Sequence, residues 1–147
     1  MGFSWEPFGR THRDETAPRA PARALPSEPA RRLALLTCMD CRIDPLAALG
    51  LALGDAVIVR NAGAAATDDA VQSLRLAHEN LGVAEVQVVA HTDCAAHRGN
   101  DPAAAGAALE AAAQIRSAVP GLRTRPALLD LRTGAVSRPG AARPPSD

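Results

Sequence analysis

The sequence predicts an α/β domain with a mainly parallel open sheet of about four to five strands flanked by helices. Short apolar runs alternate with segments of helical character, which is the pattern of such a domain. The composition is 47% hydrophobic but only 2% aromatic, so the core must be aliphatic, which suits a helix-covered parallel sheet. At 147 residues the chain predicts one domain, and its formal net charge of zero favours neither nucleic acid nor an anionic membrane as a partner.

The two ends of the chain differ in composition from its middle. Residues 1–31 are rich in Pro, Ala, Arg and Glu, and we expect a flexible or partner-docking arm that Trp5 and Phe8 anchor. Residues 32–136 form the single α/β domain, and residues 137–147 are expected to be a frayed tail.

Three apolar runs predict the central strands: Leu33–Thr37, Ala56–Arg60 and Val86–Ala90. We expect them to be buried on both faces, as strands of parallel sheets are. The segment PALLDLRTGAV, residues 126–136, predicts a last strand with a tight turn at Thr133–Gly134.

Helix start and stop signals fill the intervals between these runs. Asp44, followed by proline, predicts the N-cap of a short helix. Thr67 predicts the cap of a longer amphipathic helix that Gly82 ends. An alanine-rich helix is expected from Asp101 to about Val119, where a Pro-Gly pair stops it.

Polar residues follow each of the three central runs. Cys38 follows the first, Arg60 and Asn61 end the second, and His91 follows the third. Right-handed crossovers place the carboxyl ends of parallel strands at one edge of the sheet, which is where open α/β sheets bind ligands. The sequence therefore predicts a functional site at this edge.

Cysteine and histidine at this edge predict a zinc site. His91 and Cys94 are three residues apart, and Cys38 arrives from a neighbouring strand. If Cys41 also binds, the four residues close a structural Cys3His site in a non-catalytic protein. If Cys41 points away, three protein ligands leave a fourth position open, which is a catalytic arrangement.

Asp40 and Arg42 favour the open arrangement, because a structural site needs neither. A carboxylate can orient a water on the metal, and an arginine bound to that carboxylate keeps it ionised. A third hypothesis is a thiol-redox pair of Cys38 and Cys41, which have the C-x-x-C spacing. Arg60 and Asn61 are expected to brace the site, and Asp93 is expected to be a local cap or a surface acid.

The segments CMDCR (38–42) and HTDC (91–94) resemble the C-x-D-x-R and H-x-x-C motifs of β-class carbonic anhydrases. The intervening VIVRNAGAAATDDAVQSL is similar to the family's strand, R-N-A-G turn and helix. The resemblance implies one Zn²⁺ per chain held by Cys38, His91 and Cys94, with Asp40 and Arg42 as the catalytic pair. It also implies reversible hydration of carbon dioxide to bicarbonate and a proton by zinc-bound hydroxide.

The same resemblance implies a homodimer or higher homo-oligomer, and Asp40 as a fourth ligand in a resting state. The chain departs from the family pattern at Cys41, at Ala95, which replaces glycine, and over the short alanine-rich residues 96–125. These departures keep two alternatives open, an inactive relative and a hydrolase of another small molecule such as carbon disulfide. An odd number of cysteines without a clear export signal predicts a cytoplasmic location.

Overall fold

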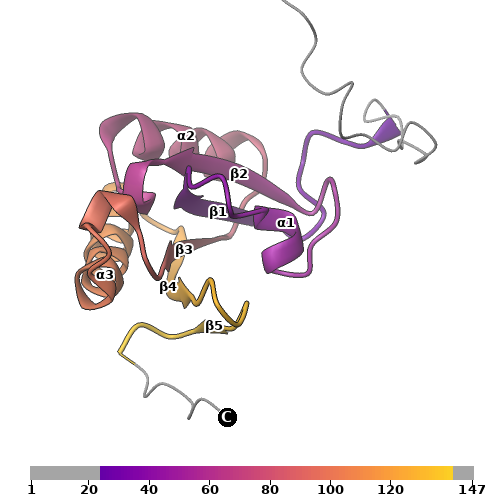
Figure 1. Cartoon of the computed structure of the whole chain (residues 1–147). Helices are drawn as coiled ribbons and strands as arrows, with labels where there is room; N and C mark the ends of the chain where they lie inside the picture. Colours follow the sequence, from indigo (N-terminus) through magenta and orange to yellow (C-terminus); the bar gives the residue numbers. More distant parts are fainter. Residues whose placement is uncertain (1–23, 141–147) are drawn as a thin grey trace, which may run out of the picture.

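The computed structural model describes residues 24–140, which form one five-stranded sheet with helices packed on it (Figure 1). The strand order is β2-β1-β3-β4-β5, with the first four strands parallel and β5 antiparallel to β4. This confirms the predicted fold class. The strands are β1 (Leu33–Cys38), β2 (Ala56–Asn61), β3 (Glu85–His91), β4 (Arg123–Leu129) and β5 (Val136–Ser137). The helices are α1 (Pro45–Ala48), α2 (Asp68–Asn80) and α3 (Asp101–Ala118).

The three central strands extend the predicted runs by one residue at their carboxyl ends. In the register, Cys38 lies opposite Asn61 of β2, and Thr37 lies opposite Val89 of β3. The carboxyl ends of β1, β2 and β3 therefore meet at one edge of the sheet, as predicted, and the polar residues that follow them lie together.

The prediction that all three central strands are buried on both faces is wrong for β2. Residues of β1 and β3 are mostly buried, whereas those of β2 are half-buried and Arg60 is exposed. The reason is the strand order, because within residues 24–140 β2 lies at the edge of the sheet with only β1 beside it. An apolar run such as Ala56–Arg60 does not by itself distinguish an edge strand from a central one.

The helices begin where their capping residues predict. Thr67 accepts a hydrogen bond from the N–H of Ala70 at the start of α2. α1 is only four residues long, and its cap is Asp44. Right-handed crossovers place α2 and α3 against one face of the sheet and α1 against the other (Figure 1). The core between the sheet and the two long helices is aliphatic, with Leu36 and Leu74 fully buried.

The predicted last strand is two strands joined by a turn. β4 begins three residues earlier than expected, at Arg123, and the Thr133–Gly134 turn leads into β5. Pro126 is tolerated within β4 because β5 pairs only with Leu128 and Leu129, so the other side of the strand is open at the proline.

The described residues begin within the predicted arm and end within the predicted tail. Trp5 and Phe8 lie outside the described residues, as do residues 141–147. The end of the arm runs beside the loop before β2, where Ala30 N–H donates to the carbonyl of Gly54 at 2.9 Å. None of the helices within residues 24–140 is long and apolar enough to cross a membrane.

Candidate metal centre

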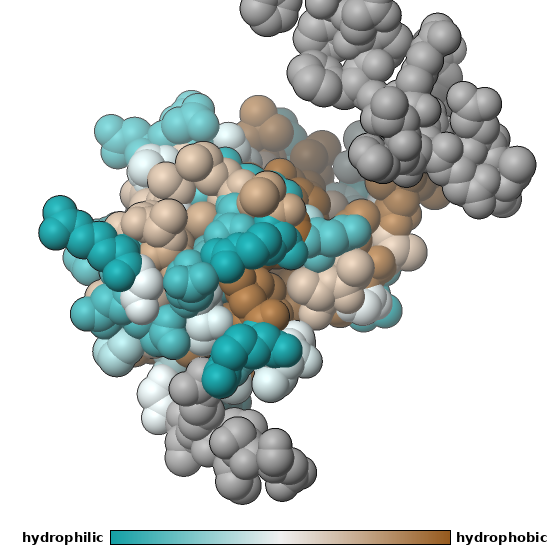
Figure 2. Space-filling model, viewed as in Figure 1, coloured by the Kyte–Doolittle hydropathy of each residue, from teal (hydrophilic) through white to brown (hydrophobic). Residues whose placement is uncertain are grey.

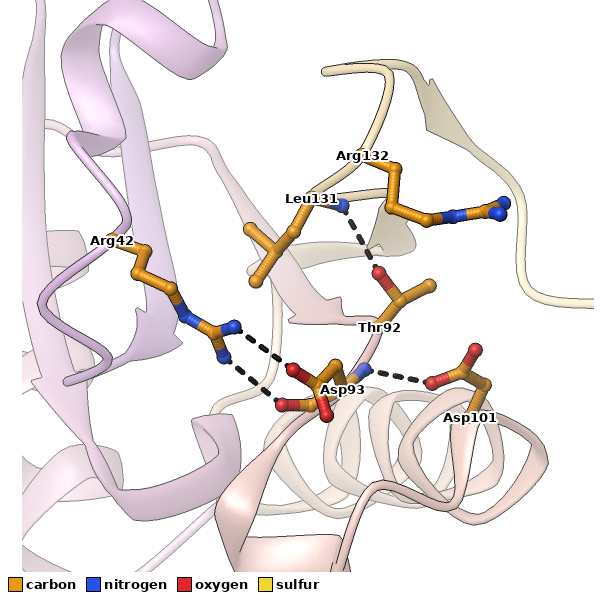
Figure 3. Close-up of a pocket in the computed structure, with 6 residues that line it drawn as sticks. All are labelled: Arg42, Thr92, Asp93, Asp101, Leu131 and Arg132. Atoms are coloured by element: carbon orange, nitrogen blue, oxygen red, sulfur yellow. Dashed lines mark hydrogen bonds and ion pairs between the residues drawn. The ribbon is translucent and has the colours of Figure 1, made fainter.

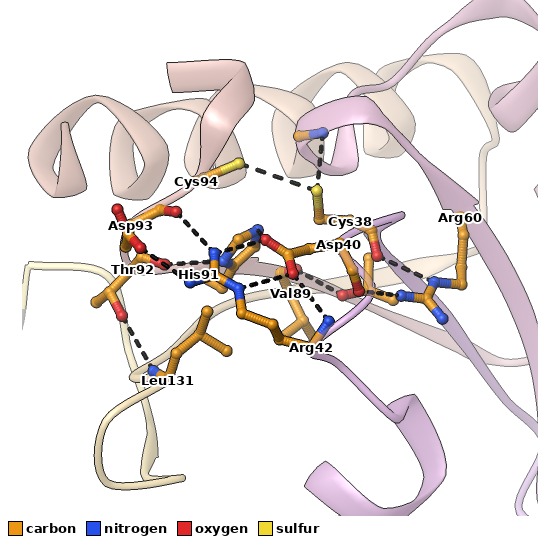
Figure 4. A network of polar contacts seen from close by, with 12 residues as sticks. Cys38, Asp40, Arg42, Arg60, Val89, His91, Thr92, Asp93, Cys94 and Leu131 are labelled. Atoms are coloured by element: carbon orange, nitrogen blue, oxygen red, sulfur yellow. Dashed lines mark hydrogen bonds and ion pairs between the residues drawn. The ribbon is translucent and has the colours of Figure 1, made fainter. Parts of the chain in front are cut away.

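Two thiols and an imidazole meet at the carboxyl edge of the sheet (Figure 4). Cys38 ends β1, His91 ends β3, and Cys94 follows three residues later, and all three are buried. Their ligand atoms lie within 4.8 Å of one another, and the two Sγ atoms are 3.9 Å apart. The structure thus brings together the three residues that the sequence proposed as metal ligands.

The imidazole of His91 offers one nitrogen to this group. Its Nδ1 lies 2.8 Å from the carbonyl oxygen of Thr92, so Nδ1–H is the donor and Nε2 carries the free lone pair. His91 is fully buried, and Nε2 has no hydrogen-bond partner among the described residues. A buried acceptor without a partner is costly, and a metal ion at this point would satisfy it.

The spacing of the sulfurs fits tetrahedral zinc. Two thiolates bound at about 2.3 Å in a tetrahedral field stand about 3.8 Å apart, close to the 3.9 Å between the Sγ atoms of Cys38 and Cys94. The N–H of Gly63 donates to the Cys38 sulfur at 3.3 Å. Burial raises the pKa of the Cys94 thiol, so a cation is needed to hold this sulfur as an anion at neutral pH.

Cys41 does not join the group. Its side chain is exposed, whereas Cys38 and Cys94 are buried, and it is absent from the cluster of ligand atoms. The geometry therefore does not support a closed Cys3His site. Ala95 is exposed as well, so its methyl group does not crowd the group.

Asp40 and Arg42 form a bidentate ion pair beside His91. Arg42 donates from Nε to Oδ1 of Asp40 at 3.0 Å and from Nη2 to Oδ2 at 2.7 Å. These hydrogen bonds hold the pKa of Asp40 well below its usual range, and the carboxylate raises the pKa of Arg42. Oδ2 of Asp40 is 3.8 Å from His91 Nε2. A carboxylate that is ionised at neutral pH thus stands next to the nitrogen that faces the group.

Arg60 braces the loop that carries these residues, as expected. Its Nε donates to the carbonyl of Cys38 at 3.0 Å and its Nη2 to the carbonyl of Asp40 at 2.8 Å. Asn61 fixes the following turn by bonding both backbone groups of Ala65. The side chains at the end of β2 therefore shape the loop after β1 rather than the metal group itself.

Asp93 has a contact that the sequence analysis did not foresee. It is an exposed acid, as expected, but not a cap, because Asn100 caps α3. Its carboxylate accepts a hydrogen bond from Nη1 of Arg42 at 2.9 Å, 51 residues away in sequence. No sequence signal for this pair exists beyond the charges themselves, since the pairing depends on how two loops meet.

A cavity of about 260 Å³ lies beside Arg42 on the side away from Cys38 and Cys94 (Figures 3 and 4). Leu131 points into the space between Arg42 and Thr92, and its backbone N–H donates to Thr92 Oγ1 at 3.0 Å. The six lining residues are Arg42, Thr92, Asp93, Asp101, Leu131 and Arg132.

The fold and the site together define an α/β protein with a Cys2His group and an adjoining Asp-Arg pair at the carboxyl edge of its sheet. The family model described as carbonic anhydrase matches residues 33–129, which include all of these residues. The chain belongs to the β-carbonic anhydrase family.

Among curated proteins, beta-carbonic anhydrase 1 of Mycobacterium tuberculosis is 41% identical over 70 residues, 48% of this chain and 43% of that protein. A carbon disulfide hydrolase of Saccharolobus solfataricus is 46% identical over 72 residues, 49% of this chain and 34% of the other. The match thus spans less than half the length of each relative. Among solved structures, a carbonic anhydrase from Streptococcus mutans has a TM-score of 0.73 at 32% identity, with 79% of this chain and 86% of that chain covered.

Proposed function

We propose that this protein is a zinc-dependent carbonic anhydrase that hydrates carbon dioxide reversibly to bicarbonate and a proton. One observation carries the proposal: the unpartnered Nε2 of His91 faces two sulfurs 3.9 Å apart, beside a carboxylate that an arginine keeps ionised. Cys38, His91 and Cys94 would hold one Zn²⁺ per chain, and Asp40 and Arg42 would form the catalytic pair.

Zinc at this position would supply a Lewis acid that lowers the pKa of water and so provides hydroxide near neutral pH. Asp40 would orient that water, since its ionised carboxylate accepts a hydrogen bond from it. Arg42 would hold the carboxylate in place through its two parallel hydrogen bonds.

The experiment combines zinc stoichiometry, X-ray absorption and stopped-flow carbon dioxide hydration. We expect one zinc per chain with two sulfur ligands, and a hydration rate that rises between pH 7 and 9. Cys38→Ala should lose zinc and activity, whereas Cys41→Ala, the matched control at an exposed cysteine, should keep both. Three sulfurs per zinc would favour the structural Cys3His alternative, and zinc without hydration activity would mean an inactive relative.

A second candidate function is hydrolysis of carbon disulfide. It is favoured by the resemblance to the hydrolase of S. solfataricus over 72 residues, a stretch as long as the match to the M. tuberculosis carbonic anhydrase. Both substrates are linear molecules in which a nucleophile attacks the central carbon, so the same residues serve either. Release of hydrogen sulfide from carbon disulfide, measured beside carbon dioxide hydration on one zinc-loaded sample, separates the two.

We further propose that the protein is a homodimer or a higher homo-oligomer. The edge of β2 is unpaired in the described chain, and large hydrophobic side chains are exposed near it, with Met39 at 67% and Leu53 at 59%. Figure 2 shows hydrophobic residues at the surface around α1 on this side of the molecule. Light scattering coupled to size-exclusion chromatography measures the mass of the particle in solution, and the mass of a single chain, 15.2 kDa, would contradict the proposed oligomer. We also propose a cytoplasmic location, which the odd number of cysteines in the sequence supports.

A further inference from the structure

Arg42 binds two acids at once, and each acid belongs to a different ligand loop (Figure 4). Besides its two bonds to Asp40, it donates from Nη1 to the carboxylate of Asp93 at 2.9 Å and from Nη2 to the Asp93 carbonyl at 3.0 Å. Asp40 follows Cys38, and Asp93 lies between His91 and Cys94. The guanidinium therefore joins the loop that carries one candidate ligand to the loop that carries the other two.

The backbone of Asp93 is held in a position that presents its carboxylate oxygen Oδ2 and its carbonyl oxygen to Arg42. Its backbone is left-handed, with φ of 54°, a conformation that aspartate and asparagine adopt more readily than most residues. Its N–H donates to Oδ1 of Asp101, the first residue of α3, at 2.8 Å (Figure 3). The turn is thus tied to the start of a long helix.

The carboxylate of Asp40 is held by the same arginine. Oδ1 accepts from the N–H and the Nε of Arg42, and Oδ2 accepts from Nη2. Oδ2 is also only 3.8 Å from Nε2 of His91. Carboxylates are good zinc ligands, so this carboxylate, once released from Arg42, would be free to bind a metal held by His91.

We propose that Asp93 is a positioning residue: it holds the guanidinium of Arg42 so that Asp40 stays bound to the arginine and does not become a fourth metal ligand. This proposal rests on the metal centre proposed above. The side chains of Asp93 and Arg42 are 75% and 49% exposed, and exposed ion pairs contribute little to the free energy of unfolding. We therefore expect loss of the Asp93 side chain to leave the free energy of unfolding nearly unchanged and to show its effect in metal coordination.

Three variants separate the carboxylate from the backbone. Asp93→Gly removes the side chain at a left-handed position that glycine adopts without strain. Asp93→Asn keeps an oxygen that accepts the bond from Arg42. The matched control is Arg98→Gly, because Arg98 lies in the same loop, is exposed, has φ of 53° and makes no hydrogen bond to Arg42.

The first measurement is an azide titration of the cobalt-loaded proteins, followed by visible absorption. Azide replaces water at an open coordination position but competes poorly with a bound carboxylate. We expect Asp93→Gly to need about tenfold more azide than the unaltered protein. Loss of a residue that supports a metal site from outside its ligands typically costs about 10–100-fold in metal affinity or activity. Asp93→Asn and Arg98→Gly should titrate like the unaltered protein. Equal titration of Asp93→Gly would overturn the proposal.

Failure of Asp93→Gly to fold while Arg98→Gly folds would also overturn it, because the role of Asp93 would then be structural. The second measurement needs neither metal nor variant. In the metal-free protein, ¹⁵N relaxation of the Arg42 Nε–H should report motion as restricted as that of the backbone, in contrast to Arg98. An Arg42 as mobile as Arg98 would refute the clamp. Neither measurement uses carbon dioxide, so a failure of the proposed reaction does not affect this test. A protein that takes up no cobalt would contradict the proposed metal centre and not the role of Asp93.

Discussion

Gly63 links the turn after β2 to the metal group, and its replacement by alanine tests the packing there. It lies in the short 3-10 helix Ala62–Ala64 with φ of 76°, and its N–H donates to the sulfur of Cys38 at 3.3 Å. A Cβ at this position would lie 3.1 Å from Cβ of Ala96 and 3.1 Å from Nε2 of His97. Both distances are shorter than ordinary contacts, so the turn Ala62–Ala64 and the turn Ala95–His97, which follows Cys94, would have to move apart.

Two costs add up in Gly63→Ala. The left-handed backbone costs alanine about 1–2 kcal/mol, and forcing a methyl group into a packed site costs about 1–3 kcal/mol more. Gly82→Ala is the matched control, because Gly82 has φ of 69° and no atom of the described residues lies within 4 Å of the position that a Cβ would take. We expect the free energy of unfolding to fall by about 2–5 kcal/mol in Gly63→Ala and by about 1–2 kcal/mol in Gly82→Ala.

The assay is urea unfolding of the zinc-free proteins, followed by zinc affinity measured in competition with a chelator. Only Gly63→Ala should bind zinc more weakly, because only this substitution displaces an N–H that bonds to a candidate ligand. The reasoning is refuted if the two variants lose the same stability, or if Gly82→Ala loses as much zinc affinity as Gly63→Ala.

Three further predictions concern metal uptake, pH and the core. Zinc binding should release protons, and the zinc affinity should rise from pH 6 to 8, because burial raises the pKa of the Cys94 thiol and its proton must leave when zinc binds. Calorimetry in buffers of different ionisation enthalpy measures the protons released, and a zinc affinity that does not change with pH would contradict this prediction. His91→Gln should abolish tight zinc binding while the zinc-free protein still folds, since Nε2 has no partner among the described residues; equilibrium dialysis and circular dichroism check this. Leu74→Ala, at a fully buried site, should lower the free energy of unfolding by about 2–5 kcal/mol. Leu76→Ala, at a side chain 56% exposed, should lower it by less than about 0.5 kcal/mol. Equal losses of unfolding free energy in urea would contradict this account of the core.

Local signals in the sequence predicted the strands and helices with small errors. Thr67 and Asp44 cap helices because a side-chain oxygen reaches backbone N–H groups only two or three residues ahead, an interaction that neighbours in sequence decide. The strand pattern failed in two places. It predicted a fully buried β2, which is half-buried, and it missed the first three residues of β4, Arg123–Arg125, which pair with β3 although their side chains are mostly exposed. Strand order is a property of the whole sheet, and an apolar run contains no information on its neighbours.

The sequence by itself determined the class of site: Cys38, His91 and Cys94 follow strands whose carboxyl ends must meet at one edge, and their chemistry suits a soft divalent metal. Only the tertiary structure decided which way the remaining side chains turn. Cys41 faces outward, and Arg42 reaches Asp93 as well as Asp40. The reason is physical: residue types and spacing set which ligands are available, whereas side-chain partners across two loops depend on turn conformations, such as the left-handed backbone of Asp93, that arise only when the loops pack together.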